Sequence, residues 1–136
     1  MKEIPLHLWP LLIAAIVRFA IGALWFSPVL FGKAFAALAG CSEEEMRKGM
    51  GKAMVADFIG GFVLCFVLIH AIVYAGATTL AQGAAVGFFN WLGFIAMPML
   101  AMVFWEHQPW KKYAIIAGFQ LVSLLVVGAG LAAWYL

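Results

Sequence analysis

Four long runs of mainly apolar residues occupy most of this chain of 136 residues. They cover residues 5–27, 53–75, 82–105 and 112–135, and a helix needs about 20 mostly apolar residues to cross a bilayer. The chain is 67% hydrophobic and 10% charged, whereas a soluble domain is roughly half apolar and a quarter charged. We therefore expect an all-α membrane protein. It would form a single domain over residues 1–136, a four-transmembrane-helix bundle.

Basic side chains gather in two of the three connections. The first connection, residues 28–52, and the third, residues 106–112, lie on the same side of a chain with four spans. Together they hold six basic residues: Lys33, Arg47, Lys48, Lys52, Lys111 and Lys112. Basic loops stay in the cytoplasm, so we expect a multi-pass protein of the plasma membrane with loops one and three cytoplasmic and both termini outside.

The second half of the first connection has the pattern of a helix start. Ser42 and Glu45 have the spacing of a capping box. Two acid–base pairs follow at i,i+4 spacing with the acid first, which favours a helix: Glu43 with Arg47, and Glu44 with Lys48. We expect a helix from about Ser42 toward the second span, with a bend at residues 49–51.

The first half of the same connection, residues 28–40, allows two interpretations. Phe31, Phe35 and Leu38 have helical spacing, and Lys33 lies off that face. An amphipathic helix of this kind would lie along the headgroup boundary. The alternative is a plain loop with apolar residues.

Strongly polar residues lie well inside the spans, and one from each span is singled out: Arg18, Asp57, Asn90 and Gln120. A charge near the bilayer centre costs from about 3 to over 10 kcal/mol, so such residues face the protein interior. Each of the four shares its helix face with alanine, glycine or serine, which let a neighbouring helix approach closely. For Asn90 these are Gly83, Gly87 and Gly93. We expect a polar layer inside the membrane.

The depth of each polar residue within the predicted membrane indicates which of them can contact one another. At 1.5 Å per residue, Arg18 and Gln120 lie roughly 3–5 Å to the cytoplasmic side of the midplane, and Asp57 lies roughly 10 Å to that side. The long arginine stem can reach across that difference. We expect Asp57 to be the partner of Arg18, with Gln120 and Asn90 available to the remaining donors. Either this pair is closed and fixes helix register, or the layer binds a polar solute or relays a proton.

The histidines and the absence of catalytic motifs give no support for a metal site or an enzyme. His7 and His70 fall at similar depth near the outer side and form a possible pair. Two histidines are too few for a metal or haem site. No catalytic signature such as Gly-x-Ser-x-Gly or His-Glu-x-x-His is present, so we expect no enzyme, no metal and no cofactor. The net charge of +2 gives no indication of nucleic-acid binding.

The third span contains two further structural signals. Pro98 lies inside it and predicts a kink that frees a backbone carbonyl near Phe94. Gly83-x-x-x-Gly87 is a motif for close helix packing. Tryptophans near the predicted span ends suit an aromatic belt at the membrane interface: Trp9, Trp25, Trp105, Trp110 and Trp134. Trp91 does not fit that belt.

Several stretches resemble a bacterial family of small four-helix membrane proteins, the domain of unknown function 1761. The most specific is IGALWFSPVLFGKAF at residues 21–35, followed by MRKGMGKAM at 46–54, WLGF at 91–94, Pro-Trp-Lys at 109–111 and AGFQLVSLLVVGAGLAAW at 117–134. The resemblance covers nearly the whole chain. It implies four spans in a bacterial inner membrane and supplies no activity and no catalytic residues.

The sequence thus favours a structural or accessory membrane protein with an interior polar layer. Besides the lipid bilayer, its partners would be a second copy or another membrane protein. The alternative is an oligomeric transporter or channel for a small polar or anionic solute, because a lone four-helix bundle has a core filled by side chains.

Overall fold

The computed structural model describes residues 8–40 and 43–135, and within these ranges it contains helices and no strand. The elements follow one another as α1 (Leu8–Trp25), α2 (Gly32–Ala39), α3 (Glu43–Ala75), α4 (Leu80–Trp91), η1 (Leu92–Ala96), η2 (Pro98–Leu100), α5 (Ala101–Phe104) and α6 (Trp110–Tyr135). Four stretches are long and apolar enough to cross a membrane: Leu8–Trp25, Glu44–Ala75, Leu80–Phe104 and Trp110–Trp134. The expectation of four such helices is confirmed.

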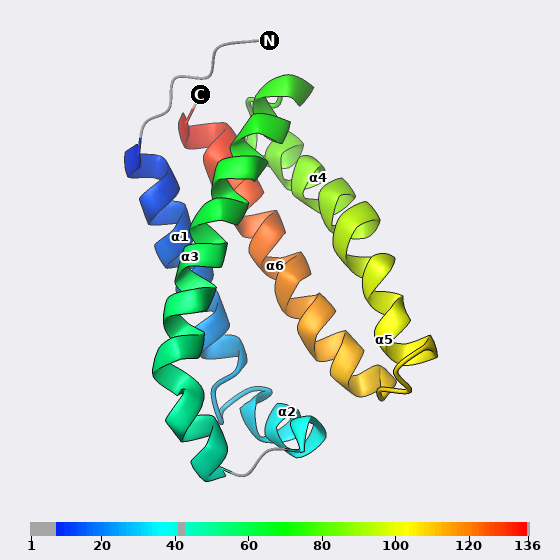
Figure 1. Cartoon of the computed structure of the whole chain (residues 1–136). Coiled ribbons are helices and arrows are strands. Elements are labelled where there is room, and N and C mark those ends of the chain that lie inside the picture. The colour runs from blue at the N-terminus through cyan, green and yellow to red at the C-terminus, as the bar shows by residue number, and fades with distance from the viewer. Residues whose placement is uncertain (1–7, 41–42, 136) are drawn as a thin grey trace.

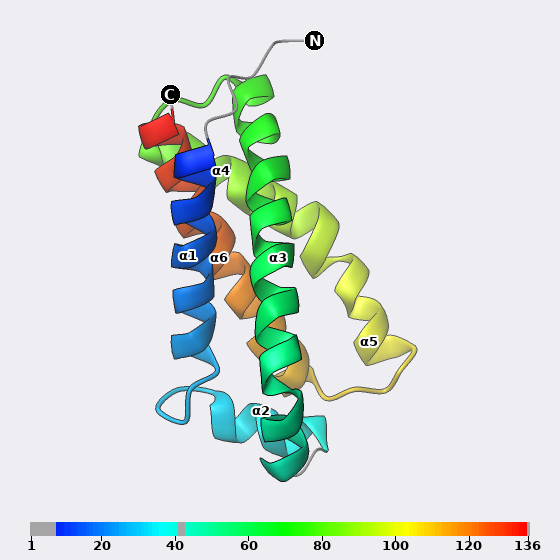
Figure 2. The same cartoon turned by 60° about the vertical axis from the view of Figure 1, so that its left-hand side comes forward.

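The last helix, α6, is the centre of the arrangement. It packs against α1 and α3 on one side and along α4 on the other (Figures 1 and 2). Helices α3 and α4 meet at the end that carries the α3–α4 connection and diverge toward the opposite end (Figure 1). The α1–α3 and α5–α6 connections lie together at that opposite end. The fold therefore places the two basic loops at one end of the molecule, as expected for a chain with four spans.

Close backbone contact joins α4 to α6. A Cβ atom at Gly83 would overlap the carbonyl oxygen of Gly128, and one at Gly87 would overlap that of Leu124. Both glycines are buried, and Gly128 faces them from α6. The Gly83-x-x-x-Gly87 motif is thus a packing surface for α6. Gly93, on the same predicted face, is exposed and has no neighbouring atoms within 4 Å of a Cβ.

A second packing region fills the half of the molecule between Arg18 and the end where α1 begins and α6 ends. Its side chains come from α1, α3 and α6 and are almost fully enclosed: Leu11, Ala14, Cys65, Leu68, Ile69, Ile72, Leu124, Val127 and Leu131. Cys65 is a free thiol in this core. The apolar core accordingly begins where the polar layer ends.

The predicted cytoplasmic helix and the second span are one continuous helix. Helix α3 runs for 33 residues without a break at residues 49–51. A Cβ placed at Gly49 or Gly51 would meet no atom of another part of the molecule within 4 Å, so both glycines lie on open faces of α3. Lys48 Nζ lies 3.8 Å from Glu44 Oε1, as the spacing predicts. Ser42 and the Glu43 side chain lie outside what the structure describes.

The stretch after α1 contains a short helix rather than a plain loop. Helix α2 covers Gly32–Ala39 and ends at Gly40, whose φ of 70° is the left-handed conformation that terminates many helices. Phe35 of α2 packs against Phe26 with ring centroids 5.1 Å apart. That contact holds α2 against the end of α1.

The kink expected at Pro98 takes the form of two irregular turns. A π-helical turn, η1, precedes Pro98, and a 3₁₀ turn, η2, begins with it. In η2 the Leu100 amide donates to Met97 O at 3.1 Å, so it does not reach Ala96 O as in an α-helix. Tyr113 Oη donates to that Ala96 carbonyl at 2.6 Å. Tyr113 of α6 thus donates to a backbone carbonyl in the irregular stretch around Pro98.

Candidate functional site

Arg18 is the buried charge around which the candidate site is built. It projects from the middle of α1 and is 5% exposed. Ala14, Ala15 and Gly22, which share its face, are also buried. The predicted small-residue face of α1 is therefore the face that contacts α3 and α6.

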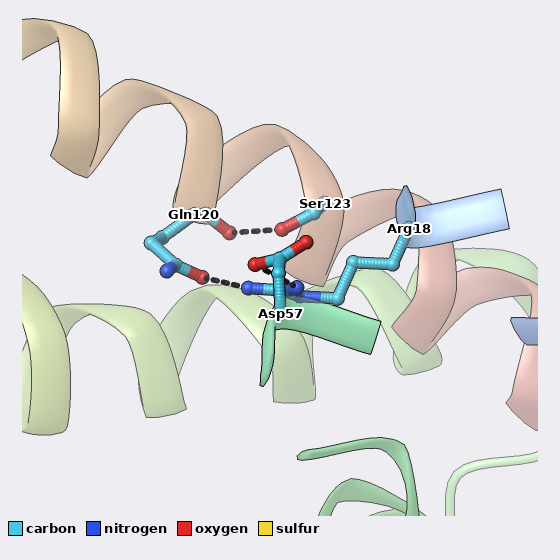
Figure 3. A network of polar contacts seen from close by, with 4 residues as sticks. All are labelled: Arg18, Asp57, Gln120 and Ser123. Atoms are coloured by element: carbon cyan, nitrogen blue, oxygen red, sulfur yellow. Dashed lines mark hydrogen bonds and ion pairs between the residues drawn. The ribbon is translucent and has the colours of Figure 1, made fainter. Parts of the chain in front are cut away.

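Two acceptors from two different helices reach the guanidinium (Figure 3). Arg18 Nη1 donates to Asp57 Oδ1 of α3 at 3.4 Å. Arg18 Nη2 donates to Gln120 Oε1 of α6 at 3.1 Å. The structure thus brings together three of the four predicted polar residues and ties α1, α3 and α6 at one level.

Small and aromatic residues shape the space around this guanidinium. A Cβ atom at Gly61 would lie 3.1 Å from Arg18 Nη1, so glycine gives the group room beside α3. The Arg18 Cζ atom lies 5.1 Å from the ring centroid of Phe119, within the range of a cation–π contact. Ser123 Oγ donates to the Gln120 backbone carbonyl at 3.1 Å (Figure 3). Phe119 is the member of this site that the sequence pattern does not reveal.

The ion pair is incomplete. A charge-assisted N–H···O bond is usually about 2.7–2.9 Å long, whereas Arg18 and Asp57 share one contact of 3.4 Å. The guanidinium has five N–H donors, and its buried Nε has no hydrogen-bond partner within the described residues. Asp57 therefore neutralises Arg18 through a single long contact.

The two members of the pair differ in exposure. The Arg18 side chain is 6% exposed, whereas that of Asp57 is 44% exposed. Asp57 lines a groove of about 390 Å³ between α1 and α3, which we call the α1/α3 groove. Its other lining residues are aromatic, thioether or small: Phe19, Phe26, Phe119, Met46, Met50, Met54, Gly22, Ala23 and Ala53. The carboxylate, and not the guanidinium, is the charged group that faces open space.

Asn90 does not join the Arg18 network. Its Nδ2 donates to Val86 O of its own helix at 2.8 Å. The side chain lies at a second groove of about 510 Å³ between α3 and α4, which is otherwise apolar. Gly60, which shares the predicted face of Asp57, also lines this groove, as Leu64 does. The expectation that Asn90 satisfies donors of Arg18 is therefore wrong, because α4 packs on α6 by its glycines and leaves Asn90 beside α3.

Of the predicted outer-side histidine pair, the structure describes His70 and not His7. His70 Nδ1 lies 2.7 Å from Phe66 O of its own helix, and its ring packs beside Phe66 at 4.8 Å. His7 lies outside the described residues. Across residues 8–40 and 43–135, no group of three or more His, Cys, Asp or Glu side chains is placed to hold a metal ion.

Two tryptophans make contacts that the aromatic-belt pattern does not predict. Trp25 Nε1 donates to Ile115 O at 2.9 Å, and Trp91 Nε1 donates to Ala117 O at 2.8 Å. Both acceptors are backbone carbonyls of α6, approached from α1 and from α4. Trp25 is thus a helix-joining residue rather than a free interfacial side chain. A tryptophan in mid-span, such as Trp91, is the sequence signal for such a bond, because a buried indole N–H needs an acceptor.

Fold and site together define a class of small all-helical protein with four helices of membrane-spanning length and an arginine enclosed among three of them. The chain belongs to the family described as Protein of unknown function (DUF1761), which matches residues 9–132. No curated protein and no solved structure matches the chain. The resemblance seen in the sequence motifs is confirmed.

Proposed function

We propose that this protein is a structural or accessory component of a membrane, without enzymatic activity, in which Arg18 holds three helices in register. One observation carries the proposal: the Arg18 side chain is 6% exposed and is contacted from both α3 and α6. A charge enclosed in this way presents almost no surface to a solute. Its interactions act between helices, where a buried polar group can specify register.

The outer surface of the α4 region offers space for partners. Of an 18-residue apolar stretch within Leu80–Phe104, 11% is buried inside the protein. The corresponding share for Trp110–Trp134 is 44%. Phe89, Phe94 and Phe104 are 67%, 77% and 63% exposed. Contiguous exposed apolar surface marks a membrane or protein contact. The proposed partners are the lipid bilayer together with a second copy or another membrane protein.

A double-mutant cycle tests the structural role of the pair. Arg18→Ala and Asp57→Ala should each lower the free energy of unfolding in micelles, because each leaves one charge without its partner. The double variant should regain part of the loss. The exposed pair Lys48 and Glu44, 78% and 79% exposed, is a matched control for which we expect almost no coupling. Additive effects at Arg18 and Asp57 would show that the pair does not hold the helices.

Affinity purification from native membranes tests the accessory role. Wild-type protein should retain a defined membrane protein or a second copy, identified by mass spectrometry. The Arg18→Ala variant should retain less, because its helices are no longer fixed. A wild-type protein recovered alone under several mild detergents would contradict the proposal.

A second candidate is an oligomeric transporter or channel for a small polar or anionic solute, and one observation favours it for a polar solute. The α1/α3 groove reaches Asp57 of the intramembrane pair. Flux of labelled solutes into proteoliposomes, with Asp57→Asn as the comparison, tests it. Equal flux in protein-free vesicles would exclude this candidate for the solutes used.

We further propose that the α1–α3 and α5–α6 loops are cytoplasmic, in the inner membrane of a bacterium. The six basic residues of these loops and their common end of the molecule support this orientation. A reporter fused after Leu136 should be active only outside the cytoplasm. Reporter activity in the cytoplasm would contradict the proposed orientation.

A further inference from the structure

The α1/α3 groove has a chemistry that the scaffold role of Arg18 does not explain. Among the residues that line it, Asp57 is the only charged one. Asp57 Oδ1 contacts Arg18, and no hydrogen bond joins Oδ2 to any residue that the structure describes. A carboxylate has about four lone-pair positions for donors. The groove thus presents an acceptor group with unused capacity.

The walls of the groove suit an apolar cation. Phe19, Phe26 and Phe119 present aromatic rings, whose faces attract organic cations. Met46, Met50 and Met54 present flexible, polarisable thioethers, which adapt to ligands of different shape. An anion would find no basic side chain among the lining residues and would face the Asp57 carboxylate.

The groove also has the size and access of a ligand site. Its volume of about 390 Å³ falls in the range of about 300–1,000 Å³ common for small-molecule pockets. Its α3 wall runs from Met46 to Asp57, a rise of about 16 Å along the helix. Met46 belongs to the part of α3 that precedes the predicted span, at the end of the molecule with the basic loops (Figure 2). The groove therefore extends along α3 from Asp57 toward that end.

We propose that the α1/α3 groove is a binding site for an amphipathic organic cation, whose charged centre contacts Asp57 and whose apolar body lies on the phenylalanines and methionines. Arg18 stays behind the carboxylate, so Asp57 bridges the guanidinium and the ligand. The long Arg18–Asp57 contact is compatible with this sharing. The proposal goes beyond the scaffold role and does not require it.

Two probes of matched shape and opposite charge test the proposal. Tetraphenylphosphonium and tetraphenylborate are titrated into the full chain in micelles by equilibrium dialysis, with empty micelles subtracted. We expect saturable binding of one phosphonium per chain, with an affinity at least about tenfold above that for the borate. Equal binding of both probes would overturn the proposal, because the groove would then be a general apolar surface.

Variants locate the site. Ala23→Phe fills the groove from α1 without removing the ion pair, and Ala53→Phe fills it from α3. We expect each to weaken phosphonium binding about tenfold or more, and Asp57→Asn to do the same. Ala85→Phe makes the same change at an exposed position of α4 and should bind like wild type. Each variant is first compared with wild type by its unfolding transition.

The outcomes separate this proposal from the scaffold role. Unchanged phosphonium binding in folded Ala23→Phe or Ala53→Phe would overturn the groove as the site. Coupling between Arg18 and Asp57 in the unfolding cycle concerns the scaffold role alone. A copurified lipid that fills the groove and prevents phosphonium binding would also contradict the proposal.

Discussion

The two sides of α6 are held by different chemistry. Toward α1 and α3, Arg18 reaches Asp57 and Gln120 and joins the helices through side chains. Toward α4, Gly83 and Gly87 bring the two backbones into direct contact. The polar side leaves a groove with an exposed carboxylate, whereas in the glycine contact a Cβ atom would overlap the facing backbone. The α1–α3–α6 side is thus joined by side-chain hydrogen bonds beside an open groove, whereas the α4–α6 side is joined by direct backbone contact.

The largest loss of stability is expected from a substitution in the glycine contact between α4 and α6. Gly83→Leu should lower the free energy of unfolding by about 3 kcal/mol, because the new side chain meets a backbone oxygen that cannot move aside. Chemical unfolding in micelles measures the change. Gly130→Leu is the matched control on α6, where no atom lies within 4 Å of an added Cβ, and should change little. Equal effects at the two sites would remove the distinction between the two sides of α6.

The next largest loss of stability is expected from removing the hydrogen bond between Arg18 and Gln120. Gln120→Leu should cost about 1.5–3 kcal/mol, the usual range for a hydrogen bond to a charged group. Gln120→Glu keeps an oxygen for Arg18 Nη2 and should lose less. The same unfolding measurement compares the two variants. If both behave like wild type, the α6 contact to Arg18 contributes nothing to stability.

A smaller loss of stability is expected from removing the hydrogen bond between Tyr113 and the Ala96 carbonyl in the irregular stretch around Pro98. Tyr113→Phe should cost about 1 kcal/mol, because Ala96 O loses its donor. Tyr74 is 51% exposed, and its hydroxyl has no hydrogen bond within the described residues. Tyr74→Phe is therefore the control and should leave the transition in place. Indistinguishable transitions would indicate that Ala96 O finds another donor.

The smallest change in stability is expected at the exposed Glu44–Lys48 pair, and it is the reference for the larger losses above. Glu44→Gln removes an exposed i,i+4 pair at 3.8 Å and should change stability by less than about 0.5 kcal/mol. High salt should reduce even this difference, because exposed pairs are screened. A loss comparable with that of Gln120→Leu would mean that the end of α3 is packed more tightly than its exposure indicates.

The polar layer shows how far sequence reasoning reaches. Arg18, Asp57 and Gln120 stand on faces of small residues, and their depths differ by less than an arginine side chain spans. That was sufficient to predict their meeting. Asn90 follows the same rule and yet lies elsewhere, because helix periodicity states which residues share a face and does not state which neighbour that face meets.

The sequence could not identify which backbone carbonyls accept hydrogen bonds from these side chains. Trp25, Trp91 and Tyr113 bond the carbonyls of Ile115, Ala117 and Ala96. A carbonyl has no side-chain signature, so its availability depends on how the chain packs around it. The same holds for Phe119, whose ring lies beside Arg18 because Gly22 gives it room: a Cβ there would be 3.2 Å from the ring.

The sequence by itself determined the strongly apolar character, the four helices long enough to cross a membrane and the need to enclose Arg18, because an apolar environment penalises exposed charge and unpaired polar backbone. Only the tertiary structure decided that α6 is central, that α4 packs by its glycines, and that Asp57 rather than Arg18 faces the groove. These depend on which faces meet, and many pairings of apolar helices have similar energy until side chains of particular size and hydrogen bonds distinguish them.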